Sequence, residues 1–385
     1  MNFSYHKVKK CLPLVLLLIL LFSTACQSKT PSVPVIQTSS LSDYLSYQQC
    51  EDGGFAQSIH PSIIAFTDLY DTYCALHILN MLDTPIPRQE HCIKFIQKVN
   101  CQDLILKDDF DEVFYYLMVA HYLNYEIPEQ DFALLSNYII SLQTDEGAIK
   151  PNQDFTKIGG NVDYNNIYSS FYLMAVTHFV ELSHFYTFDI DSDALINYLK
   201  TFSYMDIDSS LAMTAASVLI EANQVWPANA QTLDLSFLQT LYTSGFEIVE
   251  EKSDISHLRN TSIIANYLGR TNELISYLQP YYCIDGFSIN PNEQESHIMA
   301  TRIGLQTCKL LSISLDQERK NHIIDMIQSN QFYDGRFVFN RKDISYDTRI
   351  SDTFQAILLL EELGQLDLYQ SDLQSFIARR RNRFP

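Results

Sequence analysis

Three aspartates stand at or near the start of a predicted helix, and each could supply a carboxyl group for proton transfer. Asp71, Asp208 and Asp352 are each followed directly by Ser or Thr. A carboxyl group acts as an acid or a base where its surroundings shift its pKa toward the working pH. At a helix start, a carboxylate also accepts hydrogen bonds from backbone N–H groups, which requires no catalysis. These residues are candidate catalytic groups, with helix capping as the simpler interpretation.

Five further residues have side chains suited to holding a ligand: Tyr70, Asp163, Tyr168, His297 and Arg302. The chain has 24 Tyr and 23 Phe, and an aromatic wall can stabilise cationic or sugar ligands, although a helical core can use the same residues for packing. Successive residues of a helix are about 100° apart. His297 and Arg302 therefore cannot both face one pocket squarely.

Apolar residues in the remainder of the chain follow a helical period. Leu135, Tyr138, Ile139 and Leu142 have the spacing i, i+3, i+4, i+7 that marks one face of a helix. Long helices with polar residues inside apolar stripes are predicted near residues 63–81, 109–125, 163–181, 206–223, 254–269, 294–313 and 345–364. Shorter helices are predicted near 88–99, 129–142, 191–202, 232–242, 271–280, 316–330 and 368–380. The alternation predicts an inner layer and an outer layer.

One type of turn, a polar residue followed by glycine, recurs along the chain. It is found at Gly53, Gly147, Gly245, Gly286 and Gly335, at close to multiples of about 47 residues, a period typical of helical-hairpin repeats. A single repeat cannot bury its apolar face alone. The units must therefore pack on one another, in a solenoid or in a closed ring.

Two of these turns carry a longer motif. Residues 48–55 contain Gln, Asp, Gly, Gly and Phe and precede Asp71-Thr72, and residues 328–337 precede Asp352-Thr353 in the same manner. This arrangement resembles the α/α toroid of protein prenyltransferase β-subunits and squalene cyclases, over residues 45–375. The resemblance implies an all-α fold, an α/α toroid of six to seven helical hairpins in which inner helices start at a central cavity.

The catalytic motifs of those enzymes are incomplete in this chain. Where the prenyltransferases that it resembles bind zinc through Asp-Gly-Cys and a His before Thr, this chain has Asp285-Gly286-Phe287 and Asp352-Thr353. We therefore predict no metal and no cofactor. Squalene cyclases protonate their substrate with the middle carboxyl of Asp-x-Asp-Asp. The nearest match is Asp206-Ile207-Asp208-Ser209, which would give Asp208 the acid's position without the last Asp.

The first residues predict export and attachment to a membrane. Three lysines before residue 11 precede an apolar run from Leu12 to Phe22, which is suited to a signal peptide and too short for a bilayer span. The run ends at Ser23-Thr24-Ala25-Cys26, which resembles the bacterial lipobox. We predict a signal peptide over 1–25, a diacylglyceryl group on Cys26, a flexible tether over 26–42 and a toroid domain over 43–385 on the extracytoplasmic face of the cell membrane. Ordinary secretory cleavage, with Cys26 incidental, is the alternative.

Charge and cysteine usage narrow the interpretation. The formal net charge of −20 argues against nucleic-acid binding. Cys74 and Cys308 lie in apolar helical stretches and are predicted to be core residues, whereas Cys92 and Cys101 could pair in an oxidising compartment.

Three functions remain open from the sequence. The first is a membrane-anchored ligand-binding or accessory protein that holds a hydrophobic or carbohydrate ligand in the toroid. The second is an enzyme, either an isoprenoid cyclase that uses Asp208 or a carbohydrate enzyme that uses Asp71 and Asp352. The third is a scaffold for protein partners.

Overall fold

The computed structural model describes the chain from residue 41 to residue 366, with gaps. The described residues are 41–56, 67–107, 110–149, 175–202, 217–220, 222, 225–226, 235–250, 254–331, 336–337 and 350–366. All of them belong to the unit that spans residues 38–385. The predicted signal peptide, Cys26, Asp163, Tyr168, Asp208 and the turn at Gly335 lie outside the described residues.

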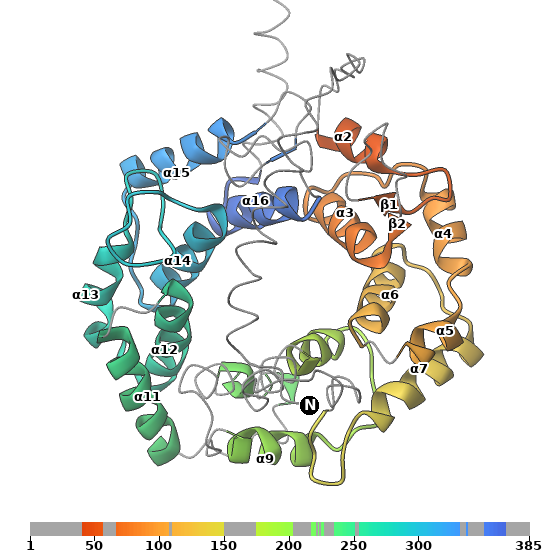
Figure 1. The fold of residues 1–385 in the computed structure, drawn as a ribbon, viewed down its shortest axis with the longest axis horizontal. Coiled ribbons are helices and arrows are strands. Elements are labelled where there is room, and N and C mark those ends of the chain that lie inside the picture. Colours follow the sequence, from red (N-terminus) through yellow and green to blue (C-terminus); the bar gives the residue numbers. More distant parts are fainter. Residues whose placement is uncertain are drawn as a thin grey trace, which may run out of the picture. The chain divides into compact units, whose positions relative to one another are not determined.

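Within this unit, helices form an inner and an outer layer around a common centre (Figure 1). Labelled inner helices are α3 (Leu69–Met81), α6 (Phe110–Tyr122), α12 (Ile255–Leu268), α14 (Ile298–Leu310) and α16 (Ile350–Glu362). The helical residues 175–182 follow α6 in the inner layer. The outer layer contains α2 (Leu41–Gln48), α4 (Gln89–Gln97), α5 (Cys101–Leu106), α7 (Glu129–Ser141), α9 (Ser192–Phe202), α11 (Leu235–Glu250), η3 (Thr271–Glu273), α13 (Ile275–Leu278), η4 (Gln279–Tyr281) and α15 (Gln317–Ser329). This alternation confirms the predicted all-α toroid.

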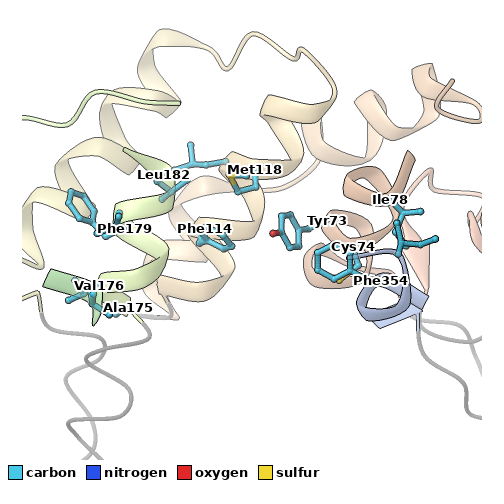
Figure 2. Packing of buried hydrophobic residues seen from close by; sticks show 14 of the residues in the cluster. Tyr73, Cys74, Ile78, Phe114, Met118, Ala175, Val176, Phe179, Leu182 and Phe354 are labelled. Carbon is cyan, nitrogen blue, oxygen red and sulfur yellow. The ribbon is translucent and has the colours of Figure 1, made fainter. Parts of the chain in front are cut away.

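The last described inner helix packs against the first. Phe354 of α16 lies with its ring centroid 5.9 Å from that of Tyr73 in α3, and Tyr73 is 5.7 Å from Phe114 of α6. Figure 2 shows Tyr73 between these two neighbours. Contacts also join α12 to α14 and α14 to α16. The α16–α3 contact joins the two ends of the repeat array. Among the described helices, none combines the length and the apolar character needed to cross a bilayer.

Three of the recurring turns share one hydrogen bond to the following inner helix. The backbone N–H groups of Phe55, Phe287 and Phe337 each donate to a threonine hydroxyl, at 3.0, 3.0 and 3.1 Å. The acceptors are Thr72, Thr301 and Thr353. All three phenylalanines are fully buried. The threonine hydroxyl and the buried phenylalanine ring together hold each turn against its helix. This role explains the Thr of the Asp-Thr motif.

Gly53 can be replaced by no other residue without strain. Its φ is +102°, and a Cβ atom there would lie 1.9 Å from the carbonyl oxygen of His91. Next to this turn, β1 (Phe55–Ala56) pairs antiparallel with β2 (Thr67–Asp68), with Phe55 opposite Asp68. Asp52 accepts hydrogen bonds from the Gly54 N–H (3.1 Å) and the Thr67 hydroxyl (2.6 Å). The Asp-Gly pair therefore has the structural role predicted from its type.

The predicted turn at Gly245 is wrong. Gly245 lies inside α11, which runs from Leu235 to Glu250 rather than ending near residue 242. Its carbonyl oxygen accepts a hydrogen bond from the Thr261 hydroxyl of α12 at 3.5 Å. Glycine in a helix costs only about 1 kcal/mol, and here it lies where α11 approaches α12 closely enough for that bond.

The five labelled inner helices all end in the same way. One residue beyond α12 and two residues beyond the other four helices, the backbone adopts a left-handed conformation, at Gly269 and at Asp83, Asn124, Ser312 and Gly364. The next N–H then donates back to a carbonyl five residues earlier, as Thr84 does to Leu79 (2.9 Å). This Schellman-type ending is the second feature of the repeat.

Candidate functional site

The candidate site lies on the sides of the inner helices that face the common centre. The hydroxyl of Tyr73 in α3 donates to Glu181 Oε1 across 3.5 Å, although α6 lies between α3 and residues 175–182 along the ring (Figure 1). Arg302 of α14 likewise acts electrostatically on Tyr73 and His77 of α3, past the intervening α16. Side chains from helices that are not neighbours in a ring can approach one another only on its inner side. These side chains therefore face the common centre.

Six residues form this group, which we call the inner cluster: Tyr73, His77, Tyr122, Glu181, Arg302 and Phe354. His77 lies at its middle, with ring centroids 5.1 Å from Tyr122 and 4.9 Å from Phe354. Its Nδ1 atom is 3.4 Å from the Tyr73 hydroxyl. The rings of Tyr73 and Tyr122 are 6.1 Å apart. These distances suit aromatic contacts, and the rings offer a wall for an apolar or cationic group.

Burial determines the charges of the inner cluster. It lowers the pKa of His77 to about 4, helped by the positive charge of Arg302, so His77 is neutral at pH 7. Burial also raises the pKa of Glu181, and it raises the pKa values of Tyr73 and Tyr122. The cluster therefore combines neutral aromatic rings with one acidic and one guanidinium group.

Arg302 has fewer hydrogen bonds than its five donors allow. Its Nη1 donates to Gln355 Oε1 at 3.1 Å, and among the described residues its buried Nε has no acceptor. Burial lowers the pKa of Arg302, while the carboxylates of Glu362 and Glu361 act to raise it. Glu362 accepts its own hydrogen bond from Gln306 Nε2 at 3.0 Å.

A second polar pair lies next to Glu181. Asp111 of α6 contacts His178 Nδ1 at 3.0 Å, and the His178 ring stacks on Phe114 at 4.0 Å between centroids. A carboxylate that contacts one imidazole nitrogen orients the ring and fixes its tautomer. His178 lies close enough to Glu181 to affect the pKa of that carboxyl group. The arrangement places an oriented imidazole beside a carboxyl group.

The candidate carboxylates Asp71 and Asp352 are the third residues of α3 and α16. Both are buried, with 3% and 9% of their surface exposed. The α3 cap itself is Asp68, whose side chain accepts a hydrogen bond from the Asp71 N–H at 2.6 Å. Asp71 is thus not the capping residue that the sequence suggested, because α3 begins two residues earlier.

The other described candidates are distributed over three places. Tyr70 is partly exposed and its ring lies 5.1 Å from Tyr115. His297 precedes the first residue of α14, and its N–H donates to the Phe287 carbonyl at 3.0 Å. Arg302 belongs to the inner cluster. His297 therefore lies beside a turn, before the helix that contains Arg302.

Sequence reasoning missed most of the inner cluster. Tyr73 and His77 are four residues apart in a predicted helix, and this spacing was the available signal for one shared face. Glu181 is 108 residues from Tyr73 in the chain, and no local pattern links them. Asp163, Tyr168 and Asp208 lie outside the described residues and stay predictions.

The described cysteines are free thiols. Cys74 and Cys308 are buried, as predicted. Cys92 donates to the Gly53 carbonyl at 3.1 Å and Cys101 lies on α5, so these two are not paired. In the described part of the chain, no three His, Cys, Asp or Glu side chains are grouped to bind a metal ion.

Solved structures with some likeness to this chain include the type II terpene cyclase MstE from Scytonema. Its apo form matches with 12% identity and a TM-score of 0.42, over 85% of this chain and 96% of that one. A variant in complex with its substrate, geranylgeranyl dihydroxybenzoate, matches with 12% identity and a TM-score of 0.43, over 84% and 95%. At these values the likeness says nothing about chemistry. A search of curated proteins found no matching sequence.

The family comparison covers most of the chain. The sequence pattern of the family described as "Prenyltransferase alpha-alpha toroid domain" matches residues 17–161 and 216–383. The match includes every labelled inner helix, and the two helix layers agree with it (Figure 1). This chain belongs to the prenyltransferase alpha-alpha toroid domain family.

Proposed function

We propose that this protein is a membrane-anchored, extracytoplasmic lipoprotein whose toroid binds an apolar ligand against the inner cluster. The observation that carries the binding proposal is that Tyr73 contacts Glu181 from a non-neighbouring helix and also lies within electrostatic range of Arg302. Burying a guanidinium and a carboxyl group is costly unless partners compensate them. A protein that only needed a core could fill this place with aliphatic side chains, as it does elsewhere.

The aromatic rings define the ligand class. The rings of Tyr122 and Phe354 each lie about 5 Å from the His77 ring, and such rings pack on unsaturated or branched hydrocarbon at low entropic cost. A carbohydrate ligand would need exposed carboxylates in addition. The two that the sequence offered, Asp71 and Asp352, are buried. The inner cluster therefore favours an apolar ligand over a sugar.

Thermal-shift measurements on the purified chain, with farnesol and with cellohexaose, test this proposal. Farnesol should raise the Tm, since a ligand that binds only the folded state stabilises it by mass action. Tyr122→Leu should reduce the farnesol shift, and Tyr267→Leu, which alters an exposed ring of α12, should leave it unchanged. A shift with cellohexaose alone would overturn the proposal, and a shift with neither would favour the partner scaffold.

The anchoring part rests on the order of charged, apolar and small residues before Cys26. Mass spectrometry of the membrane fraction tests it. We expect a mature chain that begins with a diacylglyceryl Cys26. An unmodified N-terminus at another residue, on a protein that stays in the soluble fraction, would contradict the proposal.

A second candidate function is catalysis, favoured by the Asp111–His178 pair. An imidazole oriented by a carboxylate is a common general base, and Glu181 beside it is a carboxyl group whose pKa is raised by burial. If a bound ligand is converted to product, His178→Gln should stop conversion without weakening binding. If the variant still converted the ligand to product, His178 would not be the general base.

A further inference from the structure

Arg302 keeps one edge of its guanidinium group unused. The Nη1 atom is bonded to Gln355, at the end of the group away from Nε. The Nε atom is buried and has no acceptor among the described residues. The Nε and Nη2 hydrogens point in parallel from one side of the group, and this edge matches the two oxygens of a carboxylate.

The cost of this arrangement needs an explanation. A buried donor without an acceptor destabilises the fold, and a buried charge without a counter-ion does so more strongly. Within the described residues, no carboxylate lies within 4.0 Å of the Arg302 nitrogens, since Glu362 and Glu361 act on it only electrostatically. The neutral amide of Gln355 is its one side-chain partner.

The surroundings of Arg302 restrict the charge of an anion that could bind there. Glu361, Glu362 and a second cation, Arg259, are close enough to affect its pKa, and the whole chain has a formal net charge of −20. The two carboxylates offset the two guanidinium groups, so an anion with a single charge adds less negative charge to this place than an anion with two or more. The aromatic rings of Tyr73, His77 and Phe354 lie on the α3 and α16 side of Arg302.

We propose that Arg302 binds the carboxylate of a ligand that has one acidic group on an apolar body. The inference rests on the proposed function, because the inner cluster holds the apolar body, and it adds the head group. The Nε–Nη2 edge takes both carboxylate oxygens, and the hydrocarbon lies along Phe354 and Tyr122. Phosphate and diphosphate head groups are disfavoured by the neighbouring glutamates.

Isothermal titration of the purified full chain with four probes of equal chain length tests the inference. The probes are decanoate, methyl decanoate, decyl phosphate and decylamine, each below its micelle concentration. We expect decanoate to bind roughly tenfold or more tightly than the neutral ester, as a charge-assisted bidentate contact provides. Decyl phosphate should bind more weakly than decanoate.

Each other result has a definite meaning. Equal binding of decanoate and methyl decanoate would leave the proposed function standing and overturn the role of Arg302. If decyl phosphate or decylamine bound most tightly, the proposal that the ligand's head group is a carboxylate would be wrong. No binding of any probe, with no farnesol shift, would overturn the apolar site and the inference together.

A variant pair assigns the effect to one side chain. Arg302→Gln keeps hydrogen-bonding capacity without the charge and should abolish the preference for decanoate over its ester. Arg319→Gln removes an equal charge from the outer helix α15, where Arg319 lies over the Tyr282 ring at 4.1 Å, and should keep the preference. Retention of the preference in Arg302→Gln would refute the inference. If that variant does not fold, the comparison of decanoate and ester in the native chain still decides.

Discussion

The turn at Gly53 and the inner cluster both bury polar groups, but they do so differently. At the turn, Gln49 Nε2 bonds the Gly53 carbonyl (3.1 Å) and Cys92 Sγ (2.8 Å), and Arg88 donates from Nε to Gln49 Oε1 (2.9 Å). In the inner cluster, the buried Nε of Arg302 has no acceptor among the residues that the structure describes. A satisfied network stabilises and specifies a fold, whereas an incomplete one is costly. The comparison separates a region kept for stability from the region that we propose binds a ligand.

The largest effect is expected at the turn. Gly53→Ala should lower the free energy of unfolding by at least about 3 kcal/mol, because the added Cβ would clash with the His91 backbone at a positive φ. Urea unfolding measures the change. Gly269→Ala is the matched control, since it has φ +69° with open space around it, and it should cost about 1 kcal/mol. Equal losses in the two variants would show that the turn is not tightly packed.

A pH series sharpens the electrostatic side of the comparison. The folded pKa of His77 is about 4 and its ordinary value is 6.5, so the unfolded chain binds more protons between these values. His77 therefore contributes stability above pH 6.5 that is lost as the pH falls toward 4, up to about 2–3 kcal/mol. Glu181, whose pKa is raised, acts in the opposite direction near its own pKa. The difference between the native chain and His77→Leu isolates the histidine, and parallel curves would disprove its shift.

The threonine of the repeated turn should have an intermediate effect. Thr301→Val leaves the buried Phe287 N–H without its acceptor at 3.0 Å and should cost about 2 kcal/mol by chemical denaturation. Thr301→Ser keeps the hydroxyl and should retain most of the stability. If both substitutions cost the same, the methyl group rather than the hydroxyl fastens the turn.

The smallest effect is expected at Arg302. Arg302→Met replaces an incompletely bonded guanidinium by an apolar chain, and the free energy of unfolding should stay within about 1 kcal/mol or rise. A loss as large as that of Gly53→Ala would show that Arg302 supports the fold, and the contrast between the two regions would disappear.

Local pattern was sufficient for most of the fold. Helices α6, α12 and α14 lie within the predicted ranges because their apolar residues keep the 3.6 period, and the Asp-Gly turn at Gly53 follows from residue type. The prediction at Gly245 was wrong because glycine occurs where two helices pack closely as well as in turns. The left-handed endings at Asp83, Asn124 and Ser312 carry no glycine, so their shared geometry was invisible in the sequence.

The candidate site was predictable only in part. Arg302 was named from its residue type and helix, but its partners are set by ring closure. His77 is drawn into the inner cluster by Phe354 and Arg302, which come from the other end of the chain. Such contacts depend on the angle of rotation between successive repeats around the centre. That angle cannot be read from the sequence of a single repeat.

The packing of α16 on α3 gives this array no outermost repeat. Open repeat proteins need polar terminal units and unfold from their ends. Here Phe354 and Tyr73 cover each other, so the first and last hairpins are interior ones. Fraying has no preferred starting point, and we expect the inner helices to exchange their amide hydrogens together, as one cooperative unit.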